Sequence, residues 1–114
     1  MKRGTTNENL RKLIISLKKT KKPALVAVAE KLEKPSRKRA EVNLFKIQKY
    51  AKEEETVVVP GKVLSEGNLS KKVTIAAYQF SKKAKEKIEK NGSKAISLEE
   101  LVNMGEVKNL KIIQ

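Results

Sequence analysis

The chain has 114 residues, of which 39% are apolar, and its 27 Lys and Arg residues against 13 acidic residues give a formal net charge of +14. This length fits one domain with a true hydrophobic core, so the chain is not a disordered basic tail. It contains no Cys, His, Trp or Asp, which excludes disulfides, thiolate zinc sites, imidazole catalysis and the usual magnesium and EF-hand spacings. We therefore expect no catalytic residues, no metal and no cofactor.

The N-terminal third predicts two short amphipathic helices and a basic loop. Thr5 and Glu8 have the spacing of a capping box and precede leucines at helical spacing, while Pro23 suits the first turn of a second helix. The segment after that helix carries Arg, Lys, Pro and Ser without a bulky apolar side chain, so it is expected to be a loop or an extended arm. The expected elements are helices over about residues 6–19 and 23–33 and a loop over 34–39.

The rest of the chain alternates strand-like and helix-like segments. The run Val57-Val58-Val59 is typical of a buried strand, and Pro60-Gly61 predicts a turn. Ser97 and Glu100 form a second capping-box pattern. Helices are expected over about 44–51, 82–90 and 98–104, with caps at Asn43, Ser81 and Ser97, and strands over about 56–59, 62–64, 72–79, 95–96 and 110–113.

These elements predict an α/β fold in a single domain of residues 1–114. Residues 1–39 form a basic helical arm in this interpretation, and residues 40–114 form an irregular strand–strand–helix body. The longest apolar run, Ala24 to Ala29, is far shorter than the roughly 20 residues that a bilayer needs. No secretory signal is recognisable either, so the expected compartment is the cytoplasm.

The positive charge is concentrated in two zones. Residues 1–39 have a net charge of +10 and residues 71–94 a net charge of +6, whereas residues 40–70 and 95–114 each sum to −1. Thermophile proteins raise Lys and Glu together, which does not explain a twofold surplus of cations. A polyanionic partner explains it, because bound phosphates release their condensed counterions. A solvated lysine-rich surface and an anionic membrane remain alternatives, although no long amphipathic helix with aromatic anchors is present.

The common nucleic-acid-binding modules do not fit this sequence. No zinc spacing and no G-x-x-G loop exist, and aromatic residues make up only 4% of the chain. A helix-turn-helix drawn through residues 6–33 would have an apolar second helix with few side chains to read bases. Backbone and shape recognition of structured RNA by Lys and Arg remains, and an architectural DNA- or RNA-binding protein stays open as the alternative. A Ser–Lys hydrolase is a further alternative, but its spacing occurs only by chance, as at Ser16 and Lys19.

Three sequence blocks resemble the L18e family of large-subunit ribosomal proteins of archaea and eukaryotes, which are related to bacterial protein L15. The blocks are Arg39-Ala40-Glu41-Val42-Asn43-Leu44 with Lys46-Ile47, Val57 to Leu64, and Lys72 to Ala77 with Phe80-Ser81. The resemblance covers nearly the whole chain, and the length matches the archaeal form. It implies a structural constituent of the large ribosomal subunit with an irregular α/β fold. The implied partners are large-subunit ribosomal RNA and neighbouring ribosomal proteins, with no membrane and no small-molecule substrate.

Basic side chains outside the expected core are the candidate RNA contacts. Arginine in a loop can hold a phosphate with two parallel hydrogen bonds, and Lys62 is expected to project outward after the Pro-Gly turn. Asn43 is a candidate base reader, although a helix cap is the favoured role. The predicted RNA-binding set is Lys2, Arg3, Arg11, Lys12, Lys18, Lys19, Lys21, Lys22, Lys34, Arg37, Lys38, Arg39, Asn43, Lys46, Lys62, Lys71 and Lys72.

Overall fold

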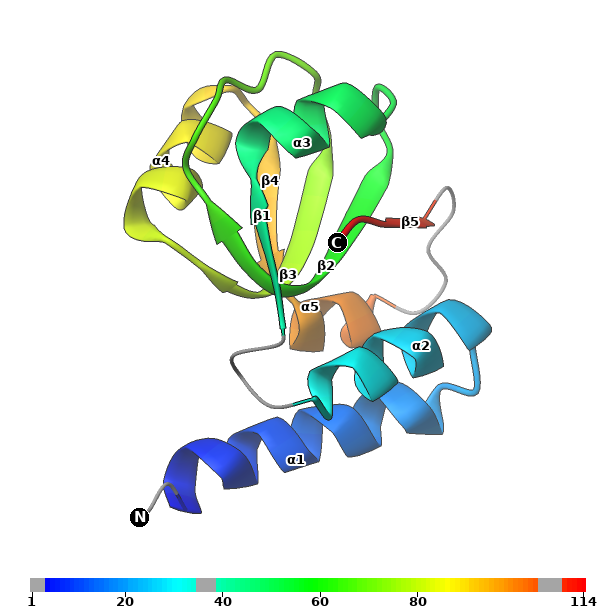
Figure 1. Ribbon diagram of the computed structural model, residues 1–114. Helices are drawn as coiled ribbons and strands as arrows, with labels where there is room; N and C mark the ends of the chain where they lie inside the picture. The colour runs from blue at the N-terminus through cyan, green and yellow to red at the C-terminus, as the bar shows by residue number, and fades with distance from the viewer. Residues whose placement is uncertain (1–3, 35–38, 105–109) are drawn as a thin grey trace.

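The computed structural model describes residues 4–34, 39–104 and 110–114, which form five helices and a five-stranded sheet (Figure 1). None of the helices in these ranges is long and apolar enough to cross a membrane. The predicted α/β class is confirmed. The helices are α1 Gly4–Lys19, α2 Pro23–Leu32, α3 Leu44–Tyr50, α4 Lys82–Lys90 and α5 Leu98–Asn103. The strands are β1 Ala40–Asn43, β2 Thr56–Leu64, β3 Thr74–Phe80, β4 Lys94–Ser97 and β5 Leu110–Ile112.

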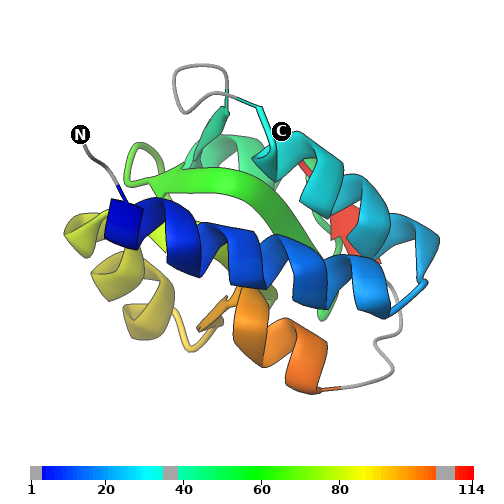
Figure 2. The same cartoon turned by 90° about the horizontal axis from the view of Figure 1, so that it is seen from below.

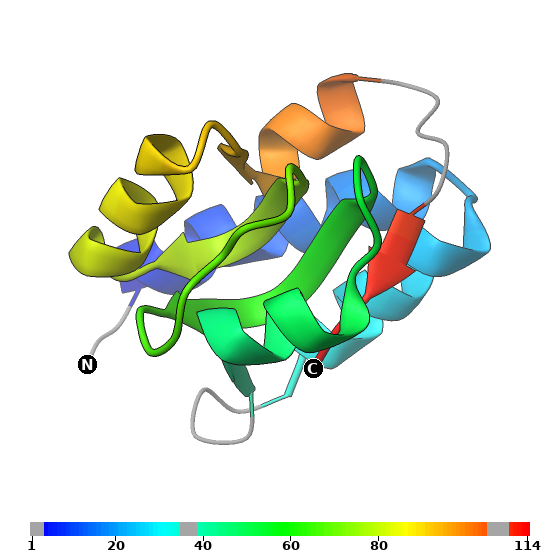
Figure 3. The ribbon, with the colours of Figure 1, turned by 90° about the horizontal axis from the view of Figure 1, so that it is seen from above.

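All strand pairs in the sheet are parallel, with β2 at its centre. Strand β3 pairs along one edge of β2 and in turn pairs with β4. The opposite edge of β2 is shared by two short strands: β5 pairs with residues 56–58 and β1 with residues 61–64 (Figure 3). The long strand β2 therefore holds together segments from both ends of the described chain.

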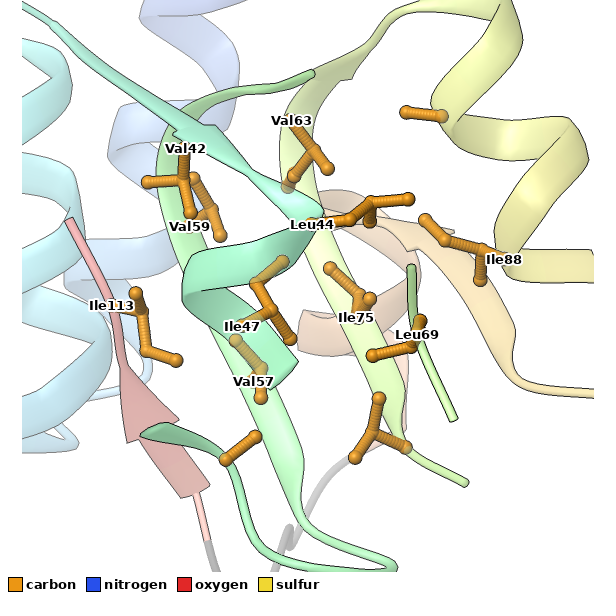
Figure 4. Packing of buried hydrophobic residues seen from close by; sticks show 14 residues of the cluster. Val42, Leu44, Ile47, Val57, Val59, Val63, Leu69, Ile75, Ile88 and Ile113 are labelled. Atoms are coloured by element: carbon orange, nitrogen blue, oxygen red, sulfur yellow. The ribbon is translucent and has the colours of Figure 1, made fainter. Parts of the chain in front are cut away.

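Helices cover both faces of the sheet, which explains the unbroken valine run in β2. Val57 and Val59 face an upper core with α3 and α4, shown in Figure 4, whereas Val58 faces a lower core with α1, α2 and α5. Strands that are buried on both faces are apolar throughout, without polar alternation. In Figure 2, α1 lies across the lower side of the molecule between α2 and α5.

The N-terminal helices are part of this layered core. Leu10, Leu13 and Leu17 of α1 and Leu32 of α2 are buried in the same cluster as Val58 of the sheet. Helices α1 and α2, which were predicted to form a basic arm, therefore make one of the helical layers. Their apolar side chains pack against the sheet and α5. Burial of such side chains is the main source of stability for short helices.

The turn predicted at Pro60-Gly61 is wrong, because β2 runs through both residues. Val59 pairs with Ala77 and Lys62 with Gln79, so two residues of β2 lie opposite one residue of β3. This two-against-one arrangement is a β-bulge, and a bulge tolerates proline because one ladder hydrogen bond is missing there. Gly61 is required by a close approach: an added Cβ would lie 2.0 Å from the carbonyl oxygen of Ala40.

Two of the four predicted caps differ in the structure. Helix α1 begins at Gly4, so Thr5 lies within it and does not precede it as a cap. Asn43 precedes α3 but makes no capping hydrogen bond, and its Oδ1 instead accepts from the backbone N–H of Glu66 at 3.2 Å. The Ser81 cap and the capping box at Ser97 are confirmed. Strand β1 at Ala40–Asn43 was not predicted from the sequence. The other elements match their predicted ranges to within two residues at each end.

Candidate nucleic-acid interface

The exposed side of α1 carries unpartnered cations. Burial of Leu13 and Leu17 against the lower core fixes the helix rotation, and this leaves Arg11, Lys12 and Lys19 exposed. Within the described part of the chain, none of these three side chains has a hydrogen-bond or ion-pair partner. Lys12 and Lys19 are seven residues apart, so they lie on the same helix face about 10 Å apart along the axis. Cations placed in this way can contact phosphates of a nucleic-acid backbone.

Lys18 is used within the protein. Its Nζ lies 2.9 Å from Oε2 of Glu33, which follows α2, and both side chains are about half exposed, at 45% and 48%. Ion pairs in such exposed positions contribute little to stability and are screened by salt. Lys18 is therefore a weaker candidate for a phosphate contact than the unpaired cations of α1.

The turn between α1 and α2 presents two further predicted contacts. The Thr20 hydroxyl donates to the carbonyl oxygen of Leu17 at 2.7 Å and accepts from the backbone N–H of Lys22 at 3.3 Å. Lys21 has a left-handed backbone with φ 57°, and its side chain is exposed whereas Lys22 is half-buried. The threonine thus holds a tight turn that projects Lys21 outward.

Arg39 and Lys62 lie together at a small hollow beside the bulge. Arg39 Nε donates to the carbonyl oxygen of Leu32 at 3.3 Å, and its guanidinium carbon lies 5.5 Å from the ring centre of Tyr78. The hollow has a volume of about 100 Å³ and is lined by Arg39, Ala40, Glu41, Gly61, Lys62, Tyr78 and Gln79. Two residues that the sequence suggested separately are therefore neighbours.

Three other predicted contacts donate to carbonyl oxygens within the protein. Lys46 Nζ donates to Gln114 at 2.5 Å, Lys71 Nζ donates to Ala51 at 2.6 Å, and Lys72 Nζ donates to Asn91. Ala51 ends α3, where cations interact favourably with the helix dipole. These lysines stabilise the local fold, and their role as RNA contacts stays a prediction.

Five residues of the predicted set remain. Lys34 is exposed just after α2. Lys2, Arg3, Arg37 and Lys38 lie outside the described residues.

The upper side carries a second group of lysines that the predicted set does not include. Helix α4 exposes Lys82, Lys83, Lys85, Lys87 and Lys90. A wide hollow of about 1,040 Å³ lies between this helix and the loop after β2, and Glu66, Glu86 and Glu89 line it together with the lysines. Lys87 Nζ donates to the carbonyl oxygens of Ser65 at 2.9 Å and Gly67 at 3.1 Å. The mixed charge makes this hollow less suitable for a polyanion than the side of α1.

Two uncharged residues outside the predicted set also line the Arg39 hollow. Tyr78 and Gln79 reach the Arg39 hollow because the bulge shifts the register of β2 against β3. Among the described residues, no group of three or more acidic side chains could hold a metal ion.

Comparison with known proteins decides the family. The family model of ribosomal proteins 50S-L15, 50S-L18e and 60S-L27a matches residues 7–96. The chain belongs to this family. The match includes strands β1, β2 and β3, whose residues line the Arg39 hollow. It confirms the resemblance drawn from the three sequence blocks.

Several relatives are similar over almost their whole length. The protein named large ribosomal subunit protein eL18 from Sulfurisphaera tokodaii is 53% identical over 112 residues, which cover 97% of this chain and 95% of the relative. The protein of the same name from Sulfolobus acidocaldarius is 57% identical over 98 residues, covering 86% and 83%. That from Haloarcula marismortui is 48% identical over 114 residues, covering 96% and 97%.

Proposed function

We propose that the chain is a structural constituent of the large ribosomal subunit, where it binds the large ribosomal RNA and supports translation in the cytoplasm. The observation that carries this proposal is the match to proteins named large ribosomal subunit protein eL18, which extends over 97% of this chain and 95% of the relative in one case. The role is structural, and catalysis has no part in it. The partners are the RNA of the large subunit and the ribosomal proteins next to it.

The lower, helical side of the molecule supports this proposal. Arg11, Lys12 and Lys19 are exposed without a described partner, and Lys21 extends the same group of charges from the end of α1. Contacts of this kind neutralise phosphates and fix the orientation of a protein on folded RNA without reading its sequence. We infer that this side faces the RNA, together with Lys34 and Arg39.

The lysines with internal partners have a supporting role in this proposal. Lys71 and Lys111 donate to the carbonyl oxygens of Ala51 at 2.6 Å and Tyr50 at 2.8 Å, both at the end of α3. They join three separate parts of the chain: α3, the loop before β3, and β5. A rigid scaffold lowers the entropy lost when side chains are ordered on binding.

Sedimentation tests the proposal. An epitope-tagged copy of the chain is expressed in its native host, and the lysate is separated on a sucrose gradient after a high-salt wash. We expect the tagged chain to travel with the large subunit. Sedimentation at the top of the gradient would contradict the proposal.

Competition with duplex DNA tests the alternative of an architectural protein. Binding to a transcript of large-subunit RNA is measured at physiological salt with increasing amounts of unlabelled duplex DNA. Preference for the folded RNA supports the ribosomal role, whereas equal affinity for any duplex supports the alternative.

A further inference from the structure

The hollow beside the bulge of β2 combines a guanidinium that is held in place with a second cation, an arrangement not seen among the cations of α1. It opens on the same side of the sheet as α1 and α2, because Tyr78 packs against the lower core and Arg39 bonds to Leu32 at the end of α2. Its volume of about 100 Å³ suits a small group and leaves no room for a stacked base. The inference that follows rests on the proposed function, since RNA supplies the ligand.

The Arg39 guanidinium is held in place from two directions. Its Nε donates to the carbonyl oxygen of Leu32 at 3.3 Å, and its guanidinium carbon lies over the Tyr78 ring, 5.5 Å from the ring centre. The two terminal nitrogens have no partner among the described residues. A guanidinium fixed in this manner presents its remaining donors as a fork, which matches two oxygens of a phosphate group.

Lys62 reaches the same hollow because of the bulge. The strand continues past Gly61 with Lys62 opposite Gln79 of β3 and Glu41 of β1. Lys62 is half-buried, and its ammonium has no hydrogen-bond or ion-pair partner in the described ranges. A half-buried ammonium without a partner gains more from an incoming anion than an exposed one, because the surrounding protein screens the interaction less than water does.

We propose that this hollow binds one phosphate group of the ribosomal RNA backbone, held by the fork of Arg39 and the ammonium of Lys62. The Tyr78 ring and the Leu32 carbonyl oxygen hold the guanidinium, and the exposed Gln79 also lines the hollow, where its amide can donate to a ribose or phosphate oxygen. The hollow is thus a single-phosphate site. It differs from the cations of α1 because the Arg39 guanidinium is held in place before RNA arrives.

Glu41 makes the proposal unusually easy to test. Glu41 also lines the hollow and its backbone is in register with Lys62, yet the two side chains form no ion pair within 4.0 Å. A carboxylate at this position repels a phosphate. Removal of its charge is therefore expected to strengthen RNA binding, whereas most substitutions in an RNA-binding surface weaken it.

The test compares three single variants by filter binding to a transcript of large-subunit RNA at several salt concentrations. Lys62→Gln is expected to lower affinity about fivefold at ~0.15 M salt and to reduce the log–log salt slope by roughly 0.7 to 0.9, as for one lost phosphate contact. Arg39→Lys keeps the charge but loses the fork, so affinity falls with little change in slope. Glu41→Gln is expected to raise affinity several-fold.

Stability controls separate binding from folding. Lys62 and Glu41 make no described side-chain hydrogen bonds, so Lys62→Gln and Glu41→Gln are expected to keep the parental Tm. Arg39→Lys loses the bond to Leu32, and for that reason the proposal depends on the other two variants. If Lys62→Gln and Glu41→Gln both bind RNA as the parent does, the phosphate site is refuted.

The remaining outcomes distinguish this site from the proposed function. One outcome is that Lys62→Gln and Glu41→Gln both leave the RNA affinity unchanged while replacement of Arg11, Lys12 and Lys19 lowers it. In that case the ribosomal role stands and the hollow has no part in it. If the parent shows no preference for the RNA over duplex DNA, the proposed function itself fails. If Lys62→Gln binds naked RNA normally but is lost from ribosomes, an acidic segment of a neighbouring protein occupies the hollow and the phosphate assignment is wrong.

Discussion

Replacing the exposed, unpaired cations of α1 gives a quantitative test of the side proposed to face the RNA. The triple variant Arg11→Gln, Lys12→Gln and Lys19→Gln removes three charges that have no partner in the described structure. Each lost phosphate contact reduces the log–log salt slope by roughly 0.7 to 0.9. If all three contact phosphates, the slope falls by about 2 to 3, and at ~0.15 M salt the affinity falls on the order of a hundredfold.

The assay is binding of the purified chain to a transcript of large-subunit RNA between low and moderate salt. The matched control is Lys82→Gln, Lys83→Gln and Lys85→Gln on α4, which removes the same charge from the opposite side of the sheet. All six side chains are exposed, so neither variant should alter the Tm. An unchanged slope in the α1 variant would refute phosphate contacts on this side of α1. An equal loss in the α4 variant would show that net charge and not this surface determines binding.

Three substitutions test the account of the fold by chemical denaturation. Gly61→Ala places a Cβ 2.0 Å from the Ala40 carbonyl oxygen, so β1 must move away and the free energy of unfolding should fall by about 1–3 kcal/mol or more; an unchanged value would contradict the close approach. Ser97→Ala removes the capping box of α5 and should cost about 1 kcal/mol. Lys21→Gly relieves the left-handed backbone at φ 57° and should raise stability by about 0.5–1 kcal/mol, and a loss of stability would show that the turn is not strained.

Local patterns predicted most of the elements because they depend on near neighbours in the chain. The valine run of β2, the capping box at Ser97 and the leucine spacing of α1 each specify their structure without help from distant residues. The error at Pro60-Gly61 has the opposite cause. A proline-glycine pair usually marks a turn. Here Gly61 pairs with Ala40 of β1, and Val59 and Lys62 on either side of the pair both join β3, so the strand continues through it.

The candidate site was less predictable than the fold, since a lysine looks the same in sequence whether its partner is RNA or a carbonyl oxygen. Lys12 and Lys46 are both basic residues on helices. The Lys12 side chain is exposed and has no described partner, whereas Lys46 donates to the carbonyl oxygen of Gln114, 68 positions along the chain. Such contacts join residues 68 positions apart, and no local pattern indicates them. The meeting of Arg39 with Lys62 likewise depends on strand register.

The parallel sheet limits where RNA can meet this protein. Because helices cover both faces, most of the strand surface is unavailable, and nucleic acid must approach through helix surfaces, loops or sheet edges. The bulge is an exception: near the ends of β2 and β3, Lys62 and Gln79 extend beyond the helical cover and line an open hollow. Gly61 allows β1 to approach closely enough to place Arg39 beside them. The glycine that permits the close strand approach is therefore also the one that brings Arg39 and Lys62 to the same hollow.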